Sequence, residues 1–234
     1  DTARVEVDAG GQTFEMMVAS GATMAMTFAS LGDGVEVTTE FEDFSARATN
    51  PMGPPNTASA SEVSGTMVFN LDRRGRAELT RSPELRGLAG DFMTPAAMVA
   101  SLFPRLPGRA VGVGETWTDT IVVDAQRANG SVAGTSVVTY TVAGDSVMDG
   151  RTLLRVTHVS EDRMHTEGAQ AGFDVVQDLA GDSEGHFLWD LAQGLLFESV
   201  TVSDYRGSMN VSAAPFPMSV SVRSTSTLRL HKGM

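Results

Sequence analysis

The segment 181–185 reads Gly-Asp-Ser-Glu-Gly and fits the Gly-x-Ser-x-Gly pattern of a nucleophile elbow, with Ser183 in the central position. In such an elbow the serine lies on a sharp turn between a strand and a following helix. Here the apolar run 186–191 follows, and its composition predicts a strand instead. We therefore interpret the match as fortuitous and expect a non-enzymatic protein. A hydrolase that uses Ser183 with a histidine is the third functional hypothesis.

Histidine is the other residue type that could act as a base or bind a metal. The chain has four: His158, His165, His186 and His231. None forms an H-x-x-x-H pair, although His158 and His165 stand seven residues apart with acidic residues nearby. We interpret these side chains as polar residues at strand ends, with a weak metal site as the alternative. The acidic residues between 174 and 190 lack the spacing of a calcium-binding loop. We expect neither a metal nor a cofactor.

Composition narrows the possible partners. The 234 residues contain no cysteine, which excludes disulfides, thiolate catalysis and Cys-ligated metals. The formal net charge is −12, and such an acidic chain repels polyphosphate, which argues against a nucleic-acid partner. Residues 73–109 are the exception, with 7 arginines against 3 acidic residues. We interpret this stretch as solvated turns with scattered arginines; docking on an anionic surface is the alternative.

Alternating hydrophobicity predicts β structure almost throughout. Residues 35–42 place apolar and threonine side chains on one face and mainly acidic ones on the other. Residues 218–230 alternate in the same way and predict one long strand, which is typical of curved sheets and open barrels. Gly-containing turns separate about ten to twelve such runs. The Pro-rich stretch 45–65 predicts an exposed loop.

One short helix is predicted over 94–104. Thr94 suits the N-cap and Pro95 the first helical position, while Pro104 ends the pattern. Met93 and Met98 have the spacing of a hydrophobic staple. The apolar face of this helix consists of Met98, Val99, Leu102 and Phe103.

A strand-and-turn signature occurs twice. Residues 65–71 read Gly-Thr-Met-Val-Phe-Asn-Leu and residues 185–191 read Gly-His-Phe-Leu-Trp-Asp-Leu, and each is followed by a turn that ends in glycine and then by a second β-rich run. Each copy predicts a hairpin. We therefore expect an all-β protein: one large, curved antiparallel sheet or open half-barrel, a single domain over 1–234. Its two similar halves would be 1–90 and 110–234, joined by a helix and linker over 91–117.

These features together resemble a known class. The helix ending in Leu-Phe-Pro, the linker up to Trp117 and the glycine-bounded hairpin resemble uncharacterised bacterial envelope proteins whose fold is similar to the LolA/LolB lipoprotein carriers. The resemblance covers most of residues 60–230, and 102–117 and 185–194 match best. It implies a curved antiparallel half-barrel with a helix on its concave side. It also implies binding of acyl chains or lipids, and it carries over no catalytic residues.

The expected function is accordingly a non-catalytic periplasmic binding protein for a lipid or other apolar ligand. The 13 methionines fit either a Met-filled core, which we favour, or a concave face lined with soft side chains. The alternative function is a structural accessory subunit docked on the periplasmic face of a larger membrane protein complex. The residues expected to line a ligand site are Phe69, Met98, Leu102, Phe103, Trp117 and Trp189.

The expected location is the periplasm. The chain starts at Asp1 without an initiator methionine, and a removed signal peptide is the simplest interpretation. No apolar run reaches the length of about 18 residues that a membrane span needs. We therefore expect an exported protein without a transmembrane segment of its own, located in the periplasm or at the periphery of a membrane.

Overall fold

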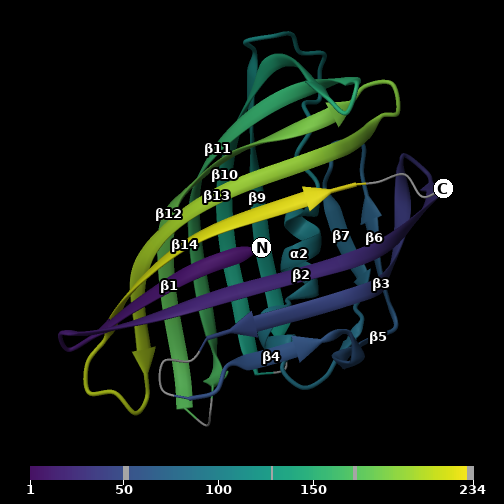
Figure 1. Cartoon of the computed structure of the whole chain (residues 1–234). Helices are drawn as coiled ribbons and strands as arrows, with labels where there is room; N and C mark the ends of the chain where they lie inside the picture. Colours follow the sequence, from purple (N-terminus) through teal and green to yellow (C-terminus); the bar gives the residue numbers. More distant parts are fainter. Residues whose placement is uncertain (50–52, 128, 171–172, 231–234) are drawn as a thin grey trace.

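A computed structural model describes residues 1–49, 53–127, 129–170 and 173–230 (Figure 1). Long antiparallel strands dominate it. The N-terminal strands are β1 (Thr2–Ala9), β2 (Gln12–Leu31), β3 (Gly34–Ala48), β4 (Asn56–Ser59), β5 (Val63–Ser64), β6 (Thr66–Leu71), β7 (Ala77–Arg81) and β8 (Glu84–Leu85). The C-terminal strands are β9 (Thr116–Arg127), β10 (Gly130–Met148), β11 (Arg151–Gln170), β12 (Phe173–Asp190), β13 (Leu195–Val211) and β14 (Met218–Arg229).

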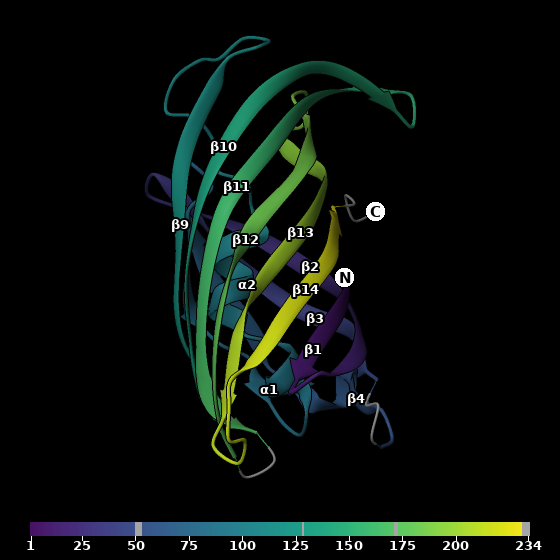
Figure 2. The same cartoon turned by 90° about the vertical axis from the view of Figure 1, so that its left-hand side faces the viewer.

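Twelve of these strands form one sheet with the order β7-β6-β3-β2-β1-β14-β13-β12-β11-β10-β9, and β4 pairs with β3 outside this path. The N-terminal strands therefore form one side and the C-terminal strands the other, and they meet where β1 pairs with β14. The long strands bend around one side of the molecule, so the sheet is strongly curved (Figure 2). The prediction of an all-β, curved antiparallel sheet is confirmed.

Both copies of the repeated signature form hairpins, and they share an irregularity. In the β6–β7 hairpin the register shifts between Val68 and Phe69. In the β12–β13 hairpin it shifts between Leu188 and Trp189, the equivalent positions of the signature. Such a shift marks a β-bulge, which bends a strand and increases its twist. The two copies therefore share a bend at equivalent positions, although their turns differ in length: residues 72–76 connect β6 to β7 and residues 191–194 connect β12 to β13.

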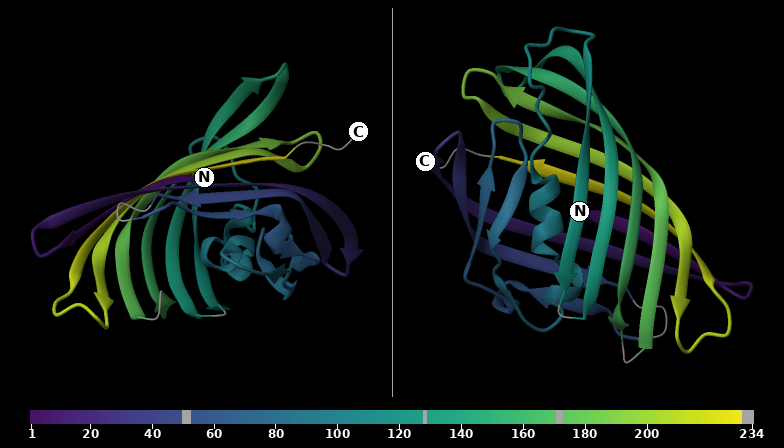
Figure 3. Two further views of the ribbon diagram at one scale, coloured as in Figure 1. Left: turned by 60° about the horizontal axis from the view of Figure 1, so that its bottom comes forward. Right: turned by 180° about the vertical axis from the view of Figure 1, so that it is seen from behind.

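Two short helices lie on the concave side: α1 (Ala89–Phe92) and α2 (Pro95–Leu102), with a 3-10 turn, η1 (Ala60–Glu62), ahead of β5. Thr94 and Pro95 occupy the N-cap and first position of α2, as the sequence predicts. α2 contacts both edge strands, β7 and β9, and lies between them (Figure 3). None of the helices among the described residues is long and apolar enough to cross a membrane.

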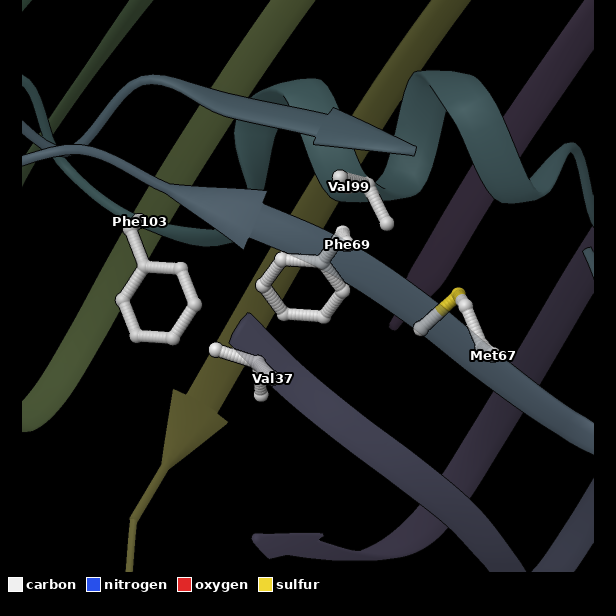
Figure 4. Close-up of a cluster of buried hydrophobic side chains, with 5 residues drawn as sticks. All are labelled: Val37, Met67, Phe69, Val99 and Phe103. Carbon is white, nitrogen blue, oxygen red and sulfur yellow. The ribbon is translucent and has the colours of Figure 1, made fainter. Parts of the chain in front are cut away.

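The core beneath α2 joins the helix to the N-terminal strands. Its buried members are Val37, Met67, Phe69, Val99 and Phe103 (Figure 4). The Phe69 and Phe103 rings lie 6.2 Å apart at a tilt of 48°, a favourable aromatic arrangement. Met98 and Leu102 pack against this core while remaining partly exposed. The predicted apolar face of the helix is therefore the face that it turns to the sheet.

The expected loop over 45–65 is wrong for most of its described length. β3 continues to Ala48, and β4 returns along it with Ala58 opposite Ala46. Both alanines are buried, in a cluster with Phe44, Ala89 and Met93. The stretch therefore contributes a paired strand and part of the core, which its Pro-rich composition does not indicate. Of the three prolines in this stretch, Pro51 lies outside the described residues.

Arg105, which follows α2, connects the two edges of the sheet. Its guanidinium donates hydrogen bonds to the backbone carbonyls of Gly75, in the β6–β7 turn, and Ala100, in α2. Its carbonyl accepts a hydrogen bond from Trp117 Nε1 on β9 at 3.0 Å, and its backbone N–H donates to the Tyr140 hydroxyl on β10 at 3.3 Å. Burial lowers the pKa of Arg105, yet a guanidinium keeps its charge at neutral pH.

Phe69→Ala should lower the free energy of unfolding by about 3–5 kcal/mol, because the ring is fully buried and the cavity cannot refill. Urea denaturation measures this loss. Phe28→Ala is the matched control: that ring is 46% exposed, and its removal should cost less than about 1 kcal/mol. Equal losses for the two variants would contradict a core centred beneath α2.

Arg105→Ala should lower the free energy of unfolding by at least about 2 kcal/mol, because a buried carbonyl, that of Gly75, and a partly buried one, that of Ala100, lose a charged donor. The control is Arg109→Ala, which removes an exposed arginine paired with Glu115 and should cost less than about 1 kcal/mol. Thermal unfolding of both variants provides the comparison. If Arg105→Ala unfolds at the same temperature as the unmodified protein, the apolar core alone stabilises the contact between the two edges of the sheet.

Candidate functional site

The concave side of the sheet contains two adjoining hollows beneath α2. The larger has a volume of about 540 Å³ and the smaller about 200 Å³. Ser101 and Leu102 of α2 and Ser199 and Thr201 of β13 line both of them. They adjoin each other between the helix and the strands of the concave side, and we refer to them together as the concave groove.

The larger hollow is apolar on one side and polar on the other. The helical segment and strands β2 and β3 contribute most of the apolar side chains, whereas β13 and β14 contribute serines and threonines and one leucine, Leu228. The apolar members are Ala22, Met24, Phe41, Phe44, Phe92, Met93, Ala97, Met98, Leu102 and Leu228. A mainly apolar wall with a few polar groups is typical of sites for small molecules.

The smaller hollow is floored by a row of serines. Ser160 on β11 lies directly opposite Ser183 on β12, which lies opposite Ser203 on β13. Because residues opposite each other in an antiparallel pair point to the same face, all three hydroxyls lie on the concave side. All three residues are buried. The row continues to Ser224 on β14.

These serines surround one carboxylate, Asp162, which is only 8% exposed. Its Oδ2 accepts hydrogen bonds from Ser183 Oγ at 2.5 Å, Ser160 Oγ at 3.1 Å and the Tyr205 hydroxyl at 3.2 Å. Ser203 Oγ lies 2.9 Å from Ser183 Oγ. Burial raises the pKa of Tyr205, so its hydroxyl keeps the proton that it donates. Asp162 Oδ1 is buried and has no partner among the described residues.

His158 forms another part of the same hollow. Its ring lies against Gly185, where a Cβ would stand 2.9 Å from Cε1, so a larger residue at 185 would displace the imidazole. Nε2 lies 3.2 Å from Thr201 Oγ1, and Nδ1 is buried with no hydrogen-bond partner in the part of the chain that the structure describes. Burial lowers the pKa of His158, and the nearby His186 adds to this effect. The ring is therefore neutral at neutral pH.

The structure divides the predicted lining residues into two groups. Met98 and Leu102 line the larger hollow, and Leu102 and Phe103 line the smaller one. Phe69 is fully buried in the core beneath α2.

Trp117 and Trp189 belong to a second apolar cluster, centred on Tyr140 and Phe187. Trp117 stacks on Tyr140 with the ring centroids 5.1 Å apart, and its Nε1 is bonded to Arg105. The two tryptophans therefore pack the wall behind the groove, whereas Met98, Leu102 and Phe103 face it.

Ser183 lies within β12, and the chain continues as a strand to Asp190. This differs from the strand–turn–helix of a nucleophile elbow. The partners of its hydroxyl are Asp162, Ser203 and Tyr205. Within the described part of the chain no histidine bonds to it. The geometry of the hydrolase hypothesis is therefore not found around Ser183.

His158 and His165 lie on opposite faces of β11, because an odd separation along a strand reverses the face. They cannot share a metal ion. His165 instead bonds to Asp178 Oδ1 at 2.7 Å and Glu167 Oε1 at 3.0 Å on the exposed convex face. In the described ranges, no group of three or more His, Asp or Glu side chains is placed to hold a metal.

Sequence reasoning missed Asp162 as a centre of the groove. Its neighbours come from three strands, and Tyr205 lies 43 residues away along the chain. Ser160, Ser183 and Ser203 are single serines on three different strands, and only the register between these strands places them opposite one another beside Asp162.

No protein-family model matches this chain, and no curated protein matches it by sequence.

The two histidines of β11 should titrate on opposite sides of the ordinary value near 6.5. Hydrogen bonds to Asp178 and then Glu167 raise the pKa of His165, and burial lowers the pKa of His158. NMR titration of the imidazole resonances measures both. A base with a lowered folded pKa costs stability as pH falls below its unfolded value, since the unfolded chain then binds more protons. His158 should therefore destabilise the fold below about pH 6.5.

His165 has the opposite effect on the stability of the fold. Its stabilising contribution is present below about pH 6.5 and is lost as pH rises through its raised folded pKa. Asp178→Asn is the matched control, because it should return the pKa of His165 toward its ordinary value and leave His158 unchanged. A His158 that titrates above the ordinary range would contradict its burial in the groove.

Proposed function

We propose that the protein is a non-catalytic binding protein that holds a lipid or another ligand with an apolar chain in the concave groove. The observation that carries this proposal is the open space beneath α2. A packed interior would have argued against a carrier. Instead, the larger hollow alone, about 540 Å³, is within the range of small-molecule sites.

The chemistry of the walls supports a long, mainly apolar ligand. Met24, Met93 and Met98 line the larger hollow together with Phe41 and Phe92. Methionine is flexible and polarisable, and it adapts to ligands of varied shape. The polar side formed by β13 and β14 would orient a ligand with one polar edge or end. Periplasmic location and likeness to the LolA/LolB carriers belong to this proposal and rest on the sequence resemblance.

A second candidate is an accessory subunit docked on a membrane protein complex. It is favoured by one observation on the convex face: Val122, Val137 and Val159 are 65%, 44% and 56% exposed on the neighbouring strands β9, β10 and β11. Exposed apolar side chains on adjacent strands are typical of surfaces that meet a partner.

Filling the groove should separate the two functions. Ser226 is exposed on β14 and lines the larger hollow, so Ser226→Trp should block a chain and weaken binding of a fluorescent fatty acid by at least about tenfold. Thr225→Trp is the matched control, since the next residue of a strand points to the other face. Its affinity should equal that of the unmodified protein.

Two outcomes contradict the carrier proposal. One is equal binding by both tryptophan variants, which would place the ligand outside the groove. The other is no binding by the unmodified protein. If such a protein is also recovered from its envelope only within a larger complex by native mass spectrometry, the accessory role is supported.

A further inference from the structure

The smaller hollow contains a charge that the fold does not neutralise. Asp162 lies on its floor, and all three of its hydrogen-bond donors converge on Oδ2. Oδ1 has no partner among the described residues, although the residue is more than nine-tenths buried. A buried carboxylate oxygen without a donor is costly, and nearly all such groups in folded proteins are satisfied.

No arginine or lysine among the described residues completes this site. The described residues around the smaller hollow include neither Arg nor Lys, and Asp162 is the one carboxylate among them. The His158 ring, which burial keeps neutral, adds no positive charge. The hollow therefore has one negative charge, several hydroxyls and an apolar roof formed by Leu102 and Phe103.

We propose that Asp162 Oδ1 binds a positively charged nitrogen, the ammonium head of an amphipathic ligand whose chain lies in the larger hollow. The inference rests on the proposed function and specifies its ligand class. An ammonium group offers the donors that Oδ1 lacks and the charge that the hollow lacks, and charge-assisted hydrogen bonds of this kind are the strong ones. The hydroxyls of Ser160, Ser183 and Tyr205 fix the carboxylate in place.

The connection between the hollows gives such a ligand its orientation. Leu102 lines both, so a chain that enters beneath α2 can pass it and reach Asp162 with its head. Arg127 lines the larger hollow and not the smaller one. A ligand with a carboxylate head would pair with Arg127 and leave Asp162 unpartnered. If the head binds at Asp162, the protein should prefer an amine to a carboxylate, and if the head binds at Arg127 it should prefer the carboxylate.

Binding of decylamine, decanol and decanoate, each below its aggregation concentration, tests the proposal by isothermal titration calorimetry. The unmodified protein should bind decylamine at least about tenfold more tightly than decanol. Asp162→Asn preserves the shape and the hydroxyl contacts but removes the charge. This variant should bind the amine and the alcohol within about threefold of each other.

Asp204→Asn is the matched control. It removes the same charge from β13, on the exposed convex face, where Asp204 lies 3.7 Å from Arg206. It should keep the full preference for the amine. Retained decanol binding by Asp162→Asn shows that the variant is folded and that its groove is intact.

Three results overturn the inference while leaving the groove as a binding site: no preference for the amine in the unmodified protein, a preference that Asp162→Asn retains, or a preference for decanoate. If Asp204→Asn loses the preference for the amine as well, the preference comes from the overall charge of the protein, and the inference is overturned. If the unmodified protein binds none of the three amphiphiles, the proposed function fails together with the inference.

Discussion

The two edges of the sheet are connected through the segment that follows α2, where Arg105 bonds to the β6–β7 turn through its buried side chain and to β9 through its backbone carbonyl. A sheet edge leaves backbone donors and acceptors free, and proteins cover or pair such edges. Here α2 lies between the edges, and Arg105 bonds to the β6–β7 turn and to α2 itself. Arg74 and Arg76 add ion pairs to Asp119 on β9, at 3.5 and 3.2 Å.

This way of joining the edges leaves space. α2 has only eight residues and covers part of the concave side, and the two hollows lie beside it. Two of the apolar clusters meet here, one around Phe69 and one around Tyr140, with Leu230 packed against both. The concave groove lies along this division, and the residues that stabilise the fold also form its walls.

The polar floor of the groove reflects a balance of physical costs. Burying Asp162 with three hydroxyl donors on one oxygen fixes the carboxylate, but it leaves the charge and the second oxygen uncompensated. If only the stability of the fold mattered, an apolar side chain at this position would cost less free energy to bury. Sites that bind ligands commonly keep such groups, because the ligand supplies the missing partner when it is bound.

The sequence by itself determined the local elements. Alternation with a period of two identified the long strands, Thr94 and Pro95 marked the start of α2, and the repeated signature encoded two hairpins with equivalent bulges. Only the tertiary structure decided which strands are neighbours and in which register. Asp162, Ser183 and Tyr205 meet because β11, β12 and β13 pair without slipping. Alternation identifies the two faces of one strand, but the position opposite it on another strand depends on every turn and bulge between them.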